Sequence, residues 1–237
     1  MKNIIYAYNK TSDAGFDTRS FSVFTKGCNL QCPYCMNSKL IDGKYKTNVN
    51  IMEKLKADVD AEKPKMIFIS GGEPTLDSVI LFAAINIFKS WGCKVGMSTN
   101  GTNPELLKKF ASGYKKIDYV ALDFKGDINA YKELGDSTYY MKVLSSWLIL
   151  REEQKLRPEF DYEIRTTLYR PFVTKEVLIE MSNLFHPNEK WVLQQFRIVD
   201  NMPSKDAEKA KIYSEKELNS ILESIIKTVP NTSIRYV

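Results

Sequence analysis

The chain has 237 residues, of which 43% are hydrophobic and 27% charged, and its formal net charge is +5. This composition is typical of a folded protein, and the length is enough for one sizeable hydrophobic core. Because positive and negative residues are mixed, as in the run DVDAEKPK at 58–65, the charge gives little support for binding to nucleic acid or to a membrane. The densest apolar stretch, from Val143 to Leu150, is too short to span a bilayer.

The amino-terminal stretch MKNIIYAYNK has only a short apolar run before polar residues resume, so it does not read as a signal peptide. We therefore expect a cytoplasmic protein whose thiols stay reduced. Three of the four cysteines lie within residues 28–35, which is typical of a metal site and not of a disulfide framework.

Segments typical of strands and of helices alternate along the first half of the chain. Alternation with many Phe and Val residues predicts a strand over 19–25. Apolar residues at four-residue spacing then predict a helix over 51–61. The other elements predicted in this half are a strand at 66–70, a helix at 79–91, a strand at 93–98 and a short helix at 104–110 that begins with proline.

The second half continues the alternation. Ser214 and Glu217 have the spacing of a capping box, which marks the start of the last predicted helix. The elements predicted here are a strand at 117–124, a helix at 139–154, a strand at 161–169, a helix at 175–185, a strand at 191–196, a helix at 214–227 and a short strand at 233–237.

These segments form six units of a strand followed by a helix, with no linker between them. Such alternation predicts a parallel sheet with helices outside, in the α/β class. Six units suit a partial (β/α)6 TIM-like barrel with its site at the carboxyl ends of the strands. We expect a single domain over 1–237, with a core at about 19–200 and a carboxyl-terminal helix and strand in 214–237.

Cys28, Cys32 and Cys35 form a C-x3-C-x2-C motif on the loop after the first predicted strand. Three thiolates can bind three corners of a 4Fe–4S cluster and leave one iron open, whereas an electron-transfer cluster normally has four cysteine ligands. The alternative is a zinc site, which needs a fourth ligand, and His186 lies in a distant Phe-His-Pro stretch. Cys93, at the start of a strand, is predicted to be a small core residue.

Three further motifs come directly after predicted strands. In the stretch SGGEPT at 70–75, two glycines allow the backbone to approach a ligand closely, although such a run is also an ordinary turn. Ser98 and Asn100 can donate hydrogen bonds to a ribose or a carboxylate, and the alternative for them is turn chemistry. Strand alternation directs Asp123 and Lys125 to the same face of the sheet. They either contact a ligand in the site or form a surface ion pair.

The cysteine motif, with an aromatic residue before its last cysteine, resembles the signature of the radical S-adenosylmethionine (SAM) superfamily. The resemblance implies that the open iron binds the amino and carboxylate groups of SAM. Electron transfer from the cluster then cleaves SAM to a 5′-deoxyadenosyl radical. Tyr34 would pack near the adenine, with a hydrophobic plug over the cluster as its alternative role. The backbone of Gly71, Gly72, Glu73 and Pro74 would lie along the methionine amino group.

Longer phrases resemble one group within the superfamily, the activating proteins of anaerobic ribonucleoside-triphosphate reductase. These proteins form a glycyl radical on the reductase and take electrons from a flavodoxin or ferredoxin. The phrases occur in chain order over about residues 20–200 and are FTKGCNLQCPYCMN, ISGGEPT, STNGTNPE, DYVALDFKG, YEIRTTL and VLQQFR.

Related activating enzymes bind the ribose and carboxylate of SAM with an Asp-x-Lys pair, which implies this role for Asp123 and Lys125. Arg165 is a candidate to steady the carboxylate, and its alternative is a partly exposed strand cation. Gln194 and Gln195 are candidates for contacts to SAM or to a partner.

The chain departs from these activating proteins at three places. Ser98 stands where many have Asp, Met36 stands where His commonly follows the third cysteine, and SDAGFDTRS at 12–20 lacks a Pro-Gly turn. Either another glycyl-radical protein or a small molecule, such as a 7-deazaguanine-type precursor, is therefore an alternative substrate. A longer first cysteine gap is frequent in the 7-deazaguanine branch and counts against it. A non-catalytic metal-binding or scaffold protein would need all these motifs to coincide by chance.

Overall fold

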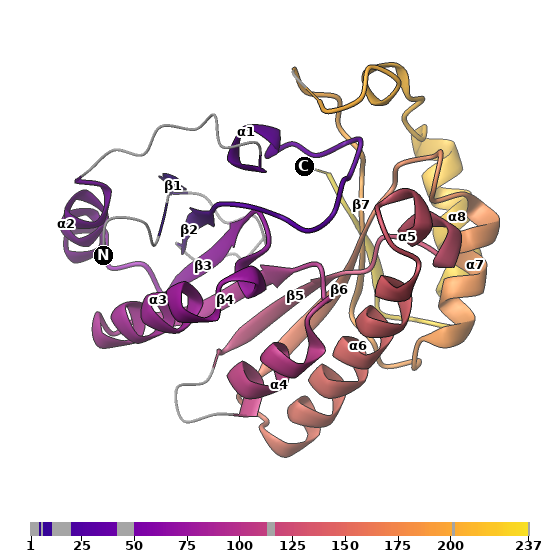
Figure 1. The fold of residues 1–237 in the computed structure, drawn as a ribbon. Helices are drawn as coiled ribbons and strands as arrows, with labels where there is room; N and C mark the ends of the chain where they lie inside the picture. The colour runs from indigo at the N-terminus through magenta and orange to yellow at the C-terminus, as the bar shows by residue number, and fades with distance from the viewer. Residues whose placement is uncertain are drawn as a thin grey trace.

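The computed structural model describes residues 5, 7–10, 20–41, 50–112, 117–200 and 202–236. In this part of the chain, strands β1 to β8 form one sheet whose spatial order follows the sequence (Figure 1). All neighbouring pairs from β2 to β8 are parallel, and β1 is antiparallel to β2. The strands are β1 (Ala7–Asn9), β2 (Ser20–Thr25), β3 (Met66–Gly71), β4 (Lys94–Thr99), β5 (Tyr119–Asp123), β6 (Asp161–Thr167), β7 (Trp191–Gln194) and β8 (Thr232–Arg235).

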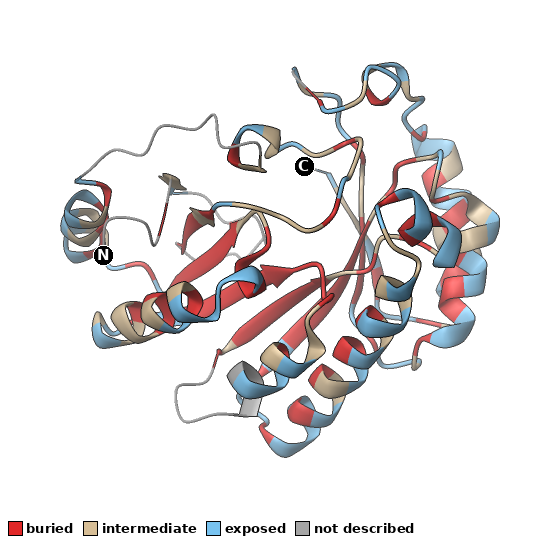
Figure 2. Ribbon diagram, in the orientation of Figure 1, coloured by how far each residue is buried: buried red, intermediate tan, exposed pale blue. Residues whose placement is uncertain are grey.

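Most helices connect successive strands and pack on the outer face of the curved sheet (Figure 1). Their buried residues face the strands and their exposed residues face outward (Figure 2). Among the described residues, no helix has the length and apolar character needed to cross a bilayer. The helices are α1 (Ser38–Ile41), α2 (Ile51–Glu62), α3 (Ser78–Ser90), α4 (Pro104–Ser112), α5 (Ile128–Glu133), α6 (Thr138–Leu156), α7 (Lys175–Leu184) and α8 (Glu215–Ile225), with short 3-10 helices η1 (Pro74–Leu76) and η2 (Ala207–Lys209).

The predicted fold class is confirmed, because β2 to β7 are each followed by a helix and form a parallel, partial barrel. The strand predicted at 161–169 ends at Thr167. Tyr169 N–H donates to the Thr167 carbonyl at 2.8 Å, and Phe172 N–H donates to the Tyr169 carbonyl at 3.0 Å. The chain therefore turns just before and across Pro171, which has no N–H to extend a strand ladder.

Besides the two 3-10 helices, three described elements were not predicted: β1, α1 and α5. The strand β1 has only three residues, and its position depends on a contact remote in sequence, in which the Tyr8 hydroxyl donates to Asp58 of α2 at 2.5 Å. The helix α5 is also short, and Asp127 caps it by accepting from Ala130 N–H at 2.9 Å. Residues 12–19 of the stretch SDAGFDTRS lie outside the described residues.

On the face of the sheet opposite the helices, one layer of side chains lies below the carboxyl ends of the strands and forms a floor there. Glu163 on β6, with no exposed surface, accepts two hydrogen bonds from Arg235 on β8 at 2.9 Å each. This bidentate pair neutralises a buried carboxylate. Beside it lies a small apolar cluster of Met66, Phe68, Tyr119 and Ala121.

The layer above this floor is polar, because side chains two positions further along each strand point to the same face. These residues stand at the carboxyl ends of β3 to β6, where a partial barrel places its site. They are Ser70, Ser98, Asp123, Arg165 and Thr167.

The loop after β2 is held against the turn after β3 through the backbone. Gly72 N–H donates to the Thr25 carbonyl at 3.0 Å, and Glu73 N–H donates to the Gly27 carbonyl at 2.7 Å. A Cβ at Gly72 would lie only 1.7 Å from the Gly27 oxygen. This contact therefore requires glycine at position 72.

We expect Gly72→Ala to lower the free energy of unfolding by about 3 kcal/mol, which is the upper end of the range for overpacked substitutions. The cost is high because the added Cβ meets the backbone, which cannot move aside as a flexible side chain can. Gly92→Ala is the control, since its φ is +78° and a Cβ there meets nothing within 4 Å. Its cost is limited to left-handed strain of roughly 1–2 kcal/mol. Chemical denaturation of both variants measures the difference, and equal losses would contradict the steric argument.

Candidate active site

A cavity of about 630 Å³ lies at the carboxyl ends of the strands. Every predicted site residue except Pro74 lines it. Those lining residues are Cys28, Cys32, Tyr34, Cys35, Gly71, Gly72, Glu73, Ser98, Asn100, Asp123, Lys125, Arg165 and Gln195. The tertiary structure thus brings together motifs that are spread over about 170 residues of sequence.

The cysteine loop, residues 26–37, crosses the carboxyl ends of the strands (Figure 1). Two backbone hydrogen bonds attach it to parts of the chain that are remote in sequence. Gln31 N–H donates to the Leu134 carbonyl at 2.9 Å, and Ser204 N–H donates to the Pro33 carbonyl at 3.2 Å. These bonds flank Cys32, the middle cysteine of the motif, and hold the loop there.

The three thiols of this loop are partly buried and free. Burial raises the pKa of Cys28 and of Cys32 to about 11 each, while the charge of Lys125 acts in the opposite direction. Lys125 acts on Cys35 in the same way. The charge of Lys125 thus offsets part of the effect of burial, which on balance disfavours the thiolate forms that bind metal.

These residues fit the predicted 4Fe–4S cluster. The three protein donors are thiols, the usual ligands of iron–sulfur clusters, and the three cysteines face one cavity. Among the described residues, no three His, Cys, Asp or Glu side chains converge on a single ion. A cluster does not need such convergence, because each thiolate binds a different iron. Cys93 is buried elsewhere, with its sulfur 3.7 Å from the Pro64 carbonyl, as predicted for a core residue.

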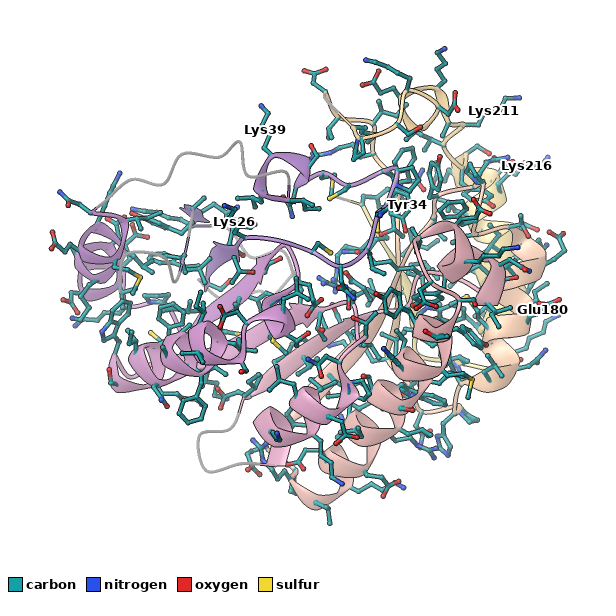
Figure 3. The ribbon with its side chains drawn as sticks, viewed as in Figure 1. Lys26, Tyr34, Lys39, Glu180, Lys211 and Lys216 are labelled. Carbon is teal, nitrogen blue, oxygen red and sulfur yellow. The ribbon has the colours of Figure 1, made fainter. Side chains whose placement is uncertain are left out.

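Tyr34 of the cysteine loop lies in the interior, whereas Lys39 of α1 points away from the molecule (Figure 3). The Tyr34 ring is 4.6 Å from Tyr169 and 6.3 Å from Phe196, measured between centroids. Only 6% of Tyr34 is exposed, and its buried hydroxyl has no hydrogen-bond partner among the described residues. The structure supports the role of Tyr34 as a hydrophobic plug, and its contact with adenine stays a prediction.

Glu73, predicted to face the ligand, uses its carboxylate inside the protein. It accepts hydrogen bonds from Thr75 N–H at 2.9 Å, the Thr75 hydroxyl at 2.6 Å, the Thr99 hydroxyl at 2.8 Å and Asn100 N–H at 2.6 Å. Only 2% of Glu73 is exposed. The side chain therefore joins the turn after β3 to the end of β4.

Pro74 is the one predicted residue that the structure places outside the cavity wall. It begins η1 and is buried, and its fixed φ suits the first position of a helical turn. The glycines of the same motif approach the cysteine loop, and a backbone contact between Gly71 or Gly72 and a ligand stays a prediction.

Four predicted residues form a continuous polar chain across three strands. The Arg165 guanidinium donates to the Ser98 hydroxyl at 2.5 Å and to Asp123 Oδ1 at 3.1 Å. Lys125 Nζ donates to Asp123 Oδ2 at 3.3 Å. Since the Lys125 side chain is only 12% exposed, this is a buried pair in the site and not a surface ion pair.

This chain contains two cations and one carboxylate, so Asp123 is paired with both Lys125 and Arg165. Burial alone would raise the pKa of Asp123, but Lys125 and Arg165 outweigh it and hold that pKa below its usual value. Asp123 therefore stays ionised at neutral pH. The arrangement positions two cations beside one carboxylate at the cavity wall, where they can bind the carboxylate and hydroxyl groups of a ligand.

Gln195 lines the cavity as predicted. Its Nε2 donates to the Tyr213 carbonyl at 2.8 Å, while its Oε1 is buried with no partner among the described residues. That oxygen is thus an acceptor able to receive a hydrogen bond from a ligand or a water.

The far wall of the cavity contains residues that the sequence analysis did not select: Thr167, Arg197 and Asp200, next to Gln194. Thr167 and Gln194 are register partners on β6 and β7. Neither side chain makes a hydrogen bond to another described residue. Strand alternation from Arg165 was the signal that could have identified Thr167.

Comparison with known proteins gave a match between residues 22–155 and the model of the radical SAM superfamily. A Methanocaldococcus jannaschii protein, provisionally named as a glycyl-radical enzyme activating enzyme, is 28% identical over 215 residues, covering 91% of this chain and 88% of the relative. A 7-carboxy-7-deazaguanine synthase of Hyperthermus butylicus is 29% identical over 108 residues, covering 43% of each chain. The structure of a radical SAM methyltransferase from Sphaerobacter thermophilus matches with a TM-score of 0.67 at 12% identity, covering 92% of this chain and 66% of that one, and so supports the fold alone.

We expect Lys125→Ala to weaken SAM binding about tenfold to a hundredfold, the range for a lost hydrogen bond to a charged group, while the iron content stays unchanged. Asp123 keeps Arg165 as a partner in this variant, so folding is retained. Lys132→Ala, at an exposed lysine of α5, is the control. Anaerobic equilibrium dialysis with labelled SAM measures the affinity. If the affinity for SAM is unchanged while the iron content is full, Lys125 does not bind SAM and only pairs with Asp123.

Proposed function

Since the chain belongs to the radical SAM superfamily, we propose that it reductively cleaves SAM and forms a glycyl radical on a partner protein. The first candidate for this partner is anaerobic ribonucleoside-triphosphate reductase. The observation that carries the SAM chemistry is that the three thiols and the polar chain from Ser98 to Lys125 face one cavity.

Cys28, Cys32 and Cys35 would hold the 4Fe–4S cluster, and the missing fourth cysteine leaves one iron for SAM. When bound, this cluster supplies the electron that cleaves SAM to a 5′-deoxyadenosyl radical. A flavodoxin- or ferredoxin-type donor in the cytoplasm would return the electron.

The protein side chains bind and orient SAM. Lys125 and Arg165 would take its carboxylate, and Asp123 would accept from its ribose hydroxyls. Ser98 and Asp123 hold the Arg165 guanidinium in place before SAM arrives, which lowers the entropy that binding must lose. Tyr34 and the aromatic residues around it exclude water from the inner side of the cysteine loop.

A protein substrate is supported by the relative from Methanocaldococcus jannaschii, which aligns with nearly the whole chain. The far wall of the cavity suits such a substrate, because Thr167 and Gln194 offer a hydroxyl and an amide that make no hydrogen bond to any other described side chain or backbone group. Both groups can hydrogen-bond to peptide N–H and C=O groups. We propose that the segment with the target glycine enters along this wall.

The second candidate is a small-molecule reaction of the 7-deazaguanine type. The alignment with the Hyperthermus butylicus synthase favours it, although that alignment covers less than half of either chain. A third possibility is activation of a different glycyl-radical protein. All three candidate functions share the SAM cleavage step and differ in the molecule on which the radical is finally formed.

The deciding experiment is electron paramagnetic resonance of the anaerobically reconstituted protein with SAM, a reductant and a candidate reductase. A glycyl-radical doublet that depends on SAM supports the activating function. If SAM is cleaved to 5′-deoxyadenosine without any protein radical, the SAM chemistry stands and this partner is wrong.

We expect Cys28→Ala, Cys32→Ala and Cys35→Ala each to abolish SAM cleavage, because two thiolates should not retain the cluster. Cys93→Ala is the matched control, since that cysteine is buried away from the cavity and its loss should affect stability only. Chromatographic measurement of 5′-deoxyadenosine gives the result. Cleavage near the wild-type rate in any of the first three variants would refute the mechanism.

We also expect Gln194→Ala to reduce the yield of glycyl radical about tenfold, as for the loss of one hydrogen bond in the transition state. SAM cleavage without the partner should be unchanged, because Gln194 takes no part in the hydrogen-bonded chain from Ser98 to Lys125. Gln154→Ala on the exposed face of α6 is the control. A parallel fall in both reactions would place Gln194 in the SAM site instead.

A further inference from the structure

Asn100 follows β4 and lies beside the cysteine loop, with only 5% of its surface exposed. Its Oδ1 accepts from Thr102 N–H at 3.0 Å and from the Thr102 hydroxyl at 2.7 Å. A backbone N–H can only donate, so this contact determines which end of the Asn100 amide is oxygen. The amide nitrogen must therefore point the other way.

On that other side, Asn100 Nδ2 donates to Asn29 Oδ1 at 2.9 Å and lies 3.9 Å from Cys28 Sγ. Asn29 Nδ2 in turn donates to the Thr102 hydroxyl at 2.8 Å. The three side chains form a closed ring in which every donor direction is determined. One N–H of Asn100 is used within the ring, and the second is directed at the Cys28 sulfur.

The sulfur of Cys28 has another donor from its own loop, since Leu30 N–H lies 3.4 Å away. Asn100 differs from this donor because it comes from β4 and is rigidly oriented by residues that bind no ligand. Its predicted contact with a ribose or carboxylate would require breaking the ring, because both ends of the amide already have partners. The geometry thus favours a role toward the sulfur.

We propose that Asn100 raises the reduction potential of the cluster through its N–H directed at Cys28 Sγ. This inference rests on the proposed function, because it needs a cluster at the three cysteines. Reduction adds negative charge that is shared with the ligand sulfurs, and an N–H dipole aimed at a sulfur stabilises the reduced form. Asn100 is therefore a positioning residue that adjusts the energy of the electron delivered to SAM.

The test is a potentiometric titration of the reconstituted protein, followed by the paramagnetic signal of the reduced cluster. In Asn100→Ala, the ratio of reduced to oxidised cluster at a given applied potential should fall about tenfold, the loss expected for one hydrogen bond. For a one-electron couple this corresponds to a shift of about 59 mV to more negative potential. Asn100→Asp keeps the shape and the acceptor for Thr102 but removes the donor, and it should shift the potential at least as far.

Thr102→Val is the matched control. It removes the hydroxyl from the ring but keeps the Thr102 backbone N–H that orients Asn100. If Asn100 acts on the sulfur, the ratio of reduced to oxidised cluster in Thr102→Val should stay within twofold of the wild-type ratio at the same applied potential. If Asn100 only anchors the loop, Thr102→Val should resemble Asn100→Ala.

Iron content separates the possible failures. Wild-type protein that binds no iron would refute the cluster itself, before any potential is measured. Unchanged potentials in the iron-loaded Asn100 variants would refute the role of Asn100 while leaving the cluster in place. Loss of iron from both Asn100 variants, with iron retained in Thr102→Val, would make Asn100 an anchor of the loop and also overturn the inference.

Discussion

The contact between Gly72 and the carbonyl of Gly27 is the constraint on which the rest of the site depends. It brings the turn after β3 against the cysteine loop at a distance that no side chain permits. Glu73, the next residue, then links this turn to the end of β4 through Thr99 and the Asn100 N–H. The cysteine loop, β3 and β4 thereby become one rigid unit, and the direction of the three thiols follows from it.

A second constraint is that polar side chains of the upper layer are hydrogen-bonded to one another. Ser98, Arg165, Asp123 and Lys125 form a chain of hydrogen bonds in which no buried charge lacks a partner. An unpaired charge at this depth would cost several kcal/mol, roughly the penalty known for isolated buried ions. A ligand with both amino and carboxylate groups can join this network without leaving any member unpaired. The Glu163 and Arg235 pair below it closes the floor in the same way.

The cavity has two walls of different character. The wall at β3 to β6 is already hydrogen-bonded within the protein, which suits a cofactor that must be held in one orientation. The wall at the ends of β6 and β7 offers Thr167 and Gln194, whose side chains have no hydrogen-bond partner in the described part of the chain, and this suits a variable substrate. Fold and function are separable in this way, because the groups that face a substrate can differ between proteins that share one fold.

The sequence by itself determined the fold class and identified the three cysteines and most of the strand-end residues that line the cavity. It could do so because strand alternation and motif spacing are local properties of the chain. It did not determine β1, whose three residues depend on the contact between Tyr8 and Asp58, or the far wall residue Thr167. Nor could it show that Glu73 and Asn100 bond within the protein. Thr99 and Asn29, which bond to them, are remote in sequence from Glu73 and Asn100 respectively. Only the packing of β3, β4 and the cysteine loop therefore decides which polar groups are already satisfied and which are left for a ligand.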